Sequence, residues 1–200
     1  QASHVWLTLL VPLAGGFGVL RKICHHPNMC VWNRKKVHTI NGRPVNELQE
    51  RYLYTLRNSL TGTLLATDDQ FVGQGFSPEE RYLGLDLPYY AQTMAGLMRL
   101  EFLHELLHEV WLENALPGDF LEAGVMRGGN CIYAKGFAEA YQIQRKVWAA
   151  DSFEGMPGKS HPMDNDEWKK LDFLSVPEDI VRDSFQRHQL LDDRVEFVKG

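Results

Sequence analysis

Cysteine is scarce in this sequence: its 200 residues include only Cys24, Cys30 and Cys131. An odd and sparse count argues against a disulfide scaffold and favours a reducing compartment, so we expect a cytoplasmic protein. An excess of basic residues is also absent, because the formal net charge is −5. Nucleic-acid binders generally carry a basic footprint. The composition therefore excludes a general nucleic-acid binder and favours an ordinary globular protein.

Hydrophobic runs are too short for a confident membrane span, which needs ~20 apolar residues. The most apolar segment, residues 5–20, contains Pro12 and three glycines. Basic residues follow this segment and do not precede it, which is unlike a signal peptide. Two interpretations stay open: a packed N-terminal arm, or a segment that contacts a protein partner or a membrane surface, with residues 34–36 at the headgroups.

Groups of potential metal ligands occur, but none has the spacing of a known site. One cysteine–histidine cluster lacks paired C-x-x-C steps, one pair of histidines lacks a third ligand, and one acidic group lacks fixed spacing. We therefore name no metal ligand and interpret these side chains as solvated or packed. They are Cys24, His25, His26 and Cys30; His104 and His108; and Asp164, Asp166 and Glu167.

Two short apolar runs separated by a glycine-rich turn form the clearest pattern that is present. The first run, 120–122, ends at Glu122, and the second, 147–150, is followed by Asp151. The spacing predicts a strand, a tight turn, a helix and a second parallel strand, which is one βαβ unit. Ligands bind beyond the carboxyl ends of the strands in such sheets, so both acids indicate a ligand site.

The glycine spacing distinguishes two adenosine-containing cofactors. The nicotinamide fingerprint is G-x-G-x-x-G, whereas Gly124 is followed here by Gly128 and Gly129. A nicotinamide oxidoreductase is therefore disfavoured and is kept as a third hypothesis. S-adenosylmethionine fits better, because its cationic sulfonium and amino groups favour a nearby carboxylate such as Glu122. Asp151 is placed to accept hydrogen bonds from ribose hydroxyls, and the glycines leave room for the rest of the cofactor.

The stretch EAGVMRGG at 122–129, together with VWAADSFEGMP at 147–157, resembles the macrocin O-methyltransferase family of the TylF/MycF type. Residues 93–100 and 190–200 resemble two further segments of that family. Ala123 and Met126 depart from it, because the family often has threonine and tryptophan there. Its members are class I S-adenosylmethionine-dependent enzymes that methylate sugar hydroxyls of natural products.

The resemblance implies a Rossmann-like class I methyltransferase fold, an α/β architecture with a mostly parallel sheet, helices on both faces and a helical N-terminal extension. It implies S-adenosylmethionine and a divalent cation, Mg²⁺, as cofactors. The family's magnesium ligands and catalytic base are aspartates of later strands and would fall beyond Gly200, so we expect the chain to be incomplete at its C-terminus. The candidate cofactor-binding residues are Thr93, Met94, Glu122, Gly124, Val125, Arg127, Gly128, Gly129, Asp151, Ser152 and Phe153.

Hydrophobic periodicity predicts the remaining elements. We expect helices over 45–60, 89–111 and 130–141, a helix over 180–188 after a capping box at 175–178, and a third strand over 195–198. The residues expected on the buried helix faces are Leu48, Tyr52, Leu56 and Leu60; Leu97, Leu100, Leu103, Leu107 and Trp111; and Cys131, Ala134, Ala138 and Tyr141.

We expect three parts: an N-terminal arm (1–44), a helical lid and pre-core segment (45–116, with a loop at 68–78), and the first half of the cofactor-binding domain (117–200). The leading hypothesis is a metal-assisted O-methyltransferase that acts on a hydroxyl of a sugar-decorated or polyketide-type small molecule, and a homo-oligomer stays open as its assembly. The alternative is a catalytically silent methyltransferase-fold subunit that serves as a binding module in a larger assembly.

Overall fold

The computed structural model describes residues 39–40, 43–44, 47–64, 77–86, 90–156 and 172–200. The predictions for the apolar segment 5–20, the cysteine–histidine cluster 24–30 and the acidic group 164–167 lie outside these residues. Most of the expected lid loop at 68–78 also lies outside them.

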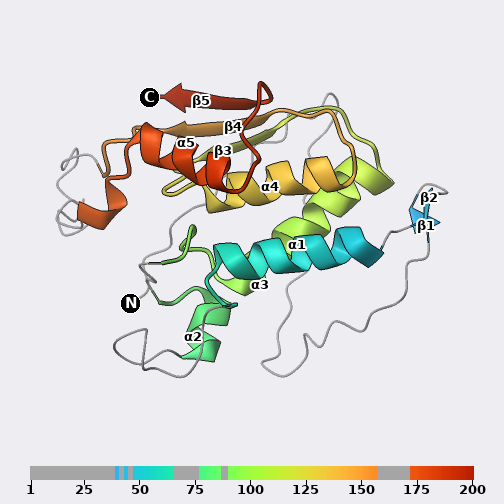
Figure 1. Cartoon of the computed structure of the whole chain (residues 1–200), viewed down its shortest axis with the longest axis horizontal. Coiled ribbons are helices and arrows are strands. Elements are labelled where there is room, and N and C mark those ends of the chain that lie inside the picture. Colours follow the sequence, from blue (N-terminus) through green and yellow to red (C-terminus); the bar gives the residue numbers. More distant parts are fainter. Residues whose placement is uncertain (1–38, 41–42, 45–46, 65–76, 87–89, 157–171) are drawn as a thin grey trace, which may run out of the picture.

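A three-stranded parallel sheet, in the order β3-β4-β5, forms one outer layer of the described structure, at the top in Figure 1. Its strands are β3 (Phe120–Ala123), β4 (Val147–Asp151) and β5 (Val195–Lys199). The register pairs Phe120 with Val147, and Val147 in turn with Val195. All three strands were predicted, and the parallel order places Asp151 at the carboxyl end of the central strand.

Two helices, α4 (Gly129–Ala140) and α5 (Glu178–Arg187), cover one face of this sheet. Glu122 of β3 points to α4, and Phe197 of β5 packs against Phe185 of α5 with the ring centroids 5.8 Å apart. Side chains alternate along a strand, so their neighbours face the other way. Leu121 and Val198 on that opposite face are 38% and 42% exposed among the described residues.

Helix α4 is the middle layer of the molecule. The helices α1 (Glu47–Leu60) and α3 (Leu97–Leu107) lie on its side away from the sheet (Figure 1). Cys131, Ala134 and Ala138 are buried as predicted, but Tyr141 is half-buried, and the burial is not limited to one face because every residue from Gly129 to Ala138 is buried. A helix that is covered on both sides has no solvated stripe to show in its sequence.

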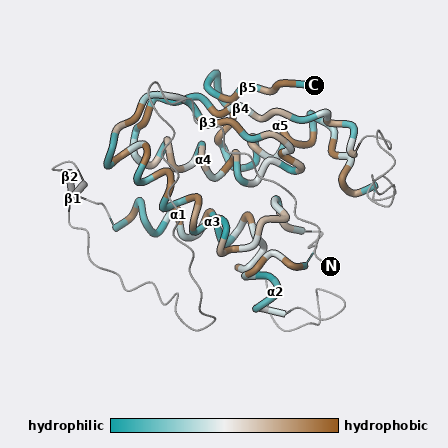
Figure 2. The backbone as a smooth tube through the Cα atoms, turned by 180° about the vertical axis from the view of Figure 1, so that it is seen from behind, coloured by the Kyte–Doolittle hydropathy of each residue, from teal (hydrophilic) through white to brown (hydrophobic). Residues whose placement is uncertain are grey.

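The buried face of α1 also differs from the prediction. Leu56 and Leu60 are buried as expected, but Leu48 and Tyr52 are 69% and 40% exposed, and Leu53 is buried instead. Each step of four residues turns about 40° beyond a full helical turn, so four such positions drift away from one face. The hydrophilic residues that dominate α1 are visible in Figure 2.

Helix α3 starts later than the expected residue 89. Residues 90–96 form turns, and Thr93 Oγ1 accepts a hydrogen bond from Ala95 N (3.0 Å). Such a side-chain bond two residues on competes with helix formation. The π-helical turn η1 (His108–Glu113) then extends the helix. Four of the five expected apolar residues are buried, namely Leu100, Leu103, Leu107 and Trp111, whereas Leu97 is half-buried.

The predicted capping box before α5 was wrong. Pro177 is the N-cap and makes no side-chain capping bond, while Ser175 N donates to Asp172 O (3.0 Å). A proline at this point fixes an extended entry, so Ser175 stays outside the helix. The remaining elements are small: β1 (Thr39–Ile40), β2 (Arg43–Pro44), α2 (Pro78–Leu83) and the 3₁₀ turn η3 (Asp172–Leu174). Within the described ranges, no helix has the length and hydropathy needed to span a bilayer.

Candidate cofactor site

The Asp151 carboxylate ties the turn after β3 to the tip of β4. Its Oδ2 accepts hydrogen bonds from the backbone N–H groups of Val125 (2.7 Å) and Met126 (3.3 Å). Its Oδ1 accepts from Phe153 N (2.9 Å) and from Ser152 Oγ (3.4 Å). A carboxylate offers about four acceptor positions, and the three backbone donors use three of them. Asp151 thus braces the turn, and its role as an acceptor for ribose hydroxyls stays a prediction.

One of these contacts is easily exchanged. Ser152 Oγ lies closer to Gly155 O, at 3.0 Å, than to Asp151 Oδ1. A hydroxyl has a single hydrogen to donate, so the shorter contact takes it. The Oδ1 atom of Asp151 can therefore accept a hydrogen bond from a ligand hydroxyl without losing its backbone donors.

Open space is present over Gly124 but not over the two later glycines. A Cβ at Gly124, which has φ +83, would meet nothing within 4 Å. At Gly128 it would lie 2.8 Å from Val181, and at Gly129 2.6 Å from the Gln92 carbonyl oxygen. We expected all three glycines to make room for a ligand. Gly128 and Gly129 instead allow close packing of the protein on itself, and room for a ligand is found at Gly124.

Two non-glycine residues beside Asp151 adopt left-handed backbone angles. They are Met126, with φ 49, and Phe153, with φ 56. Such conformations are uncommon and cluster at functional sites, where surrounding contacts hold them. Both residues donate their N–H groups to Asp151. Phe153 is 6% exposed and its ring centroid lies 6.3 Å from that of Phe197, so it packs toward the core, and its part in cofactor binding stays a prediction.

Glu122 is buried beneath the turn and is not exposed at a strand tip. Its Oε1 accepts from Asn130 Nδ2 (2.7 Å) and its Oε2 from Cys131 Sγ (3.1 Å). Burial raises the pKa of the Glu122 carboxyl to about 7, although the hydrogen bonds from Cys131 and Asn130 lower it, and the charge of Asp151 raises it further. Burial and the two donors therefore act on the Glu122 carboxyl in opposite directions.

The segment 91–95 lies against the start of α4. Thr93 Oγ1 donates to Asn130 Oδ1 (3.1 Å), Gly129 N donates to Gln92 O (3.0 Å), and an Arg127 Nη1 donates to Ala91 O (3.0 Å). The structure thus brings Thr93 and Arg127 to the turn. Met94 follows in the same segment and is half-buried.

Sequence reasoning missed Asn130 as a site residue and interpreted Cys131 only as a buried small residue. The burial is confirmed, because Cys131 is 0% exposed, but its thiol also contacts Glu122. A usable signal was present: a polar residue directly after a glycine pair, at the first turn of a helix, faces the tip of the preceding strand.

The histidine pair on α3 and η1 contacts protein groups. His104 is buried and its Nδ1 lies 2.8 Å from Tyr133 Oη, as expected for a satisfied core histidine. His108 lies 3.4 Å from Glu113. In the part of the chain that the structure describes, no three His, Cys, Asp or Glu residues are grouped so that they could hold a metal ion.

Comparison with known proteins matches residues 38–200 to a family model described as macrocin-O-methyltransferase (TylF). The chain is 36% identical over 163 residues to mycinamicin III 3''-O-methyltransferase of Micromonospora griseorubida, covering 76% of the chain and 64% of the relative. It is 38% identical over 163 residues to 8-demethyl-8-(2,3-dimethoxy-alpha-L-rhamnosyl)-tetracenomycin-C 4'-O-methyltransferase of Streptomyces olivaceus. That match covers 77% of the chain and 62% of the relative.

A solved structure, that of the O-methyltransferase NovP, is similar with a TM-score of 0.69 and 34% identity over 76% of this chain. That match covers 64% of the NovP chain. The chain therefore spans less than two thirds of the length of these relatives. The similarity confirms the expected Rossmann-like methyltransferase fold.

Proposed function

Because this chain belongs to the macrocin-O-methyltransferase (TylF) family, we propose that it is part of an S-adenosylmethionine-dependent O-methyltransferase. One observation carries the proposal: the turn with open space over Gly124 is braced by Asp151 and lies beside the buried Glu122. The combination offers an acceptor for ribose hydroxyls, a place where no side chain blocks the ligand, and negative charge next to it.

The described residues fit this cofactor, which supplies an activated methyl group on a sulfonium. Asp151 Oδ1 would accept a ribose hydroxyl in exchange for the long contact to Ser152. Gly124 would allow the ligand to approach the backbone. Glu122 would stabilise a cationic ligand when it is deprotonated, because opposite charges attract strongly in a site of low dielectric constant. In-line methyl transfer depends mainly on such alignment.

A small-molecule hydroxyl is the proposed acceptor. The two relatives from Micromonospora and Streptomyces are named for the methylation of hydroxyl groups on mycinamicin III and on a rhamnosyl-tetracenomycin. A third relative is demethyldecarbamoylnovobiocin O-methyltransferase of Streptomyces niveus, 37% identical over 131 residues. By similarity, we propose a hydroxyl of a sugar-decorated or polyketide-type molecule for this chain.

A divalent cation is a separate part of the proposal. The described residues offer no cluster that fits it, so none of them is assigned as a ligand and no step is derived through the ion. We also assign no catalytic base within the chain.

Calorimetric titration with S-adenosylmethionine tests the cofactor site. We expect binding by the chain and a loss of affinity of at least about tenfold in Asp151→Asn, because a hydrogen bond to a charged acceptor is lost or weakened. Asp193→Asn is the matched control, since Asp193 is exposed in the turn before β5, at the far end of the sheet. Equal affinity in both variants would contradict the assignment of Asp151.

A further inference from the structure

A hydrogen-bonded network of buried polar side chains lies behind the candidate cofactor site. It consists of Thr93, Asn130, Cys131 and Glu122, which are 6%, 9%, 0% and 6% exposed. They come from three places: the segment before α3, the first turn of α4, and β3. Buried polar groups destabilise a protein unless they are hydrogen-bonded, so a connected set of this kind points to a specific role.

The hydrogen bonds of this set all run toward Glu122. Ala95 N donates to Thr93 Oγ1 (3.0 Å), and Thr93 Oγ1 donates to Asn130 Oδ1 (3.1 Å). This fixes the side-chain amide of Asn130 so that its NH₂ group donates to Glu122 Oε1 (2.7 Å). A flipped amide would set its oxygen against the Glu122 oxygen, so the bond to the carboxylate would be lost.

The second oxygen of Glu122 is held by a thiol. Cys131 Sγ lies 3.1 Å from Glu122 Oε2. Burial raises the pKa of the Cys131 thiol well above its usual value, and the neighbouring Glu122 raises it further. Cys131 therefore stays protonated and acts as a donor. It is not a thiolate nucleophile.

We propose that Thr93, Asn130 and Cys131 are positioning residues that hold the Glu122 carboxylate in its charged form and in one orientation beside the cofactor turn. This inference rests on the proposed function, because a charged Glu122 matters only if a cationic ligand binds there.

The balance at Glu122 explains why the donors matter. Burial disfavours the charged form and raises the pKa of Glu122, and the Asp151 carboxylate on β4 acts in the same direction. The donors on α4, Cys131 and Asn130, oppose both effects. Each donor therefore favours the charged form of Glu122, and the loss of one donor shifts the balance toward the neutral acid.

Carbon-13 NMR titration of the Glu122 carboxyl group in the ligand-free chain tests the positioning role directly. In Cys131→Ala we expect the titration midpoint to rise by about one pH unit, which is the expected effect of one lost hydrogen bond to a charged group. Cys131→Ser keeps a donor of similar size and should return the midpoint close to that of the wild type. An unchanged midpoint in Cys131→Ala would overturn the proposal for Cys131.

Thr93 offers a second, matched pair of variants. Thr93→Val keeps the side-chain shape but removes the hydroxyl, so the Asn130 amide is free to turn and the Glu122 midpoint should rise. Thr93→Ser keeps the hydroxyl and should titrate like the wild type. If Cys131→Ala does not fold, the Thr93 variants decide the outcome. Equal Glu122 titration midpoints in Thr93→Val and Thr93→Ser would overturn the role of the hydrogen-bond donors.

Calorimetry with S-adenosylmethionine between pH 5 and 9 separates this inference from the proposed function. The wild type should bind more weakly as the pH falls below about 7, and the pH of that change should rise in Cys131→Ala and Thr93→Val. Absence of binding by the wild type at every pH would defeat the proposed function, and the NMR result would still decide the hydrogen-bond network. Binding with identical pH profiles in all variants would overturn the positioning role alone.

Discussion

At the scale of single residues, two buried titratable groups oppose each other in their effect on stability. Glu122 has a folded pKa of about 7, raised from 4.5 chiefly by burial. His104 has a folded pKa of about 4, lowered from 6.5 chiefly by burial. Glu122 therefore contributes stability that is present below pH 4.5 and lost as the pH rises to 7. His104 contributes stability that is present above pH 6.5 and lost as the pH falls to 4.

We predict that Glu122→Gln removes the pH dependence of stability that Glu122 causes. Relative to the wild type, the variant should gain about 3 kcal/mol in free energy of unfolding between pH 4.5 and 7, as the shift in pKa implies. Urea unfolding at a series of pH values measures this difference. The matched variant His104→Gln should show the opposite trend, gaining stability relative to the wild type as the pH falls from 6.5 to 4. Parallel curves for Glu122→Gln and the wild type would show that the buried carboxyl does not titrate in this range.

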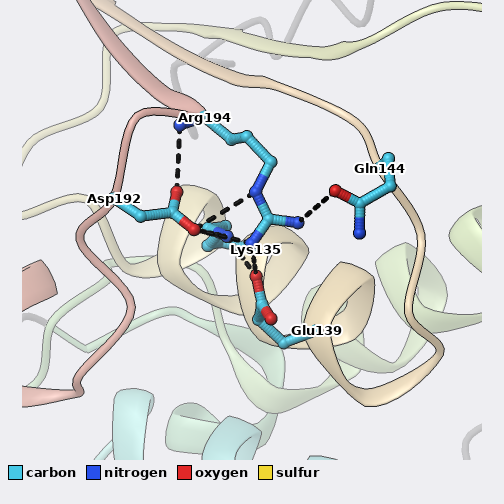
Figure 3. Close-up of polar contacts among 5 residues, drawn as sticks. All are labelled: Lys135, Glu139, Gln144, Asp192 and Arg194. Carbon is cyan, nitrogen blue, oxygen red and sulfur yellow. Dashed lines mark hydrogen bonds and ion pairs between the residues drawn. The ribbon is translucent and has the colours of Figure 1, made fainter.

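At the scale of elements, an ion cluster joins the C-terminal half of α4 to the start of β5 (Figure 3). Lys135, which is fully buried, contacts Asp192 at 2.8 Å and also Glu139. Arg194 contacts the same two carboxylates and donates to Gln144 at 3.4 Å. Burial alone would raise the pKa of Asp192, but hydrogen bonds from Lys135 and Arg194 lower it to about 2. The cluster lies at the sheet end opposite Asp151 and fixes the orientation of α4, whose first turn faces the cofactor site.

Lys135→Met should destabilise the chain by about 2 kcal/mol. This is less than the cost of breaking a fully buried pair, because Asp192 and Glu139 are 36% and 40% exposed and keep Arg194 as a partner. Urea unfolding at pH 7 provides the measurement. Arg187→Met on α5 is the control, since its pair with Asp183 is exposed on both sides and should contribute less than about 1 kcal/mol. Equal effects of the two substitutions would mean that the buried ammonium of Lys135 adds nothing beyond a surface pair.

At the scale of the whole molecule, cofactor binding and methyl transfer should separate on metal removal. The candidate cofactor site, as far as the structure describes it, contains no cluster of metal ligands, so we expect S-adenosylmethionine to bind equally well in the presence of EDTA. The proposed cation acts on the acceptor, so EDTA should abolish methyl transfer to a panel of glycosylated polyketides and Mg²⁺ should restore it. Radiolabelled methyl transfer and calorimetry on the same sample measure the two effects. Transfer that persists in EDTA would exclude the cation, and binding without transfer under any condition would favour the catalytically silent subunit.

The sequence by itself determined the βαβ unit and the position of Asp151. Two apolar runs, a glycine turn and a strand-ending acid are local features, and the chain adopts them where they were predicted. The sequence also identified Thr93 and Arg127 near the turn, through the family resemblance. The buried face of α3 followed from its leucine spacing, because one side of that helix packs on α4.

Only the tertiary structure decided where Glu122 points and what holds it. The alternation of β3 turns Glu122 to the face that α4 covers, and its partners Asn130 and Cys131 come from that helix. The same cause explains the packing of Gly129 against Gln92, residues 37 positions apart in the sequence. Periodicity reports which residues of one element share a face, but it does not report which element will cover that face. Contacts between distant segments are therefore fixed only when the sheet, α4 and the segment 91–95 pack together.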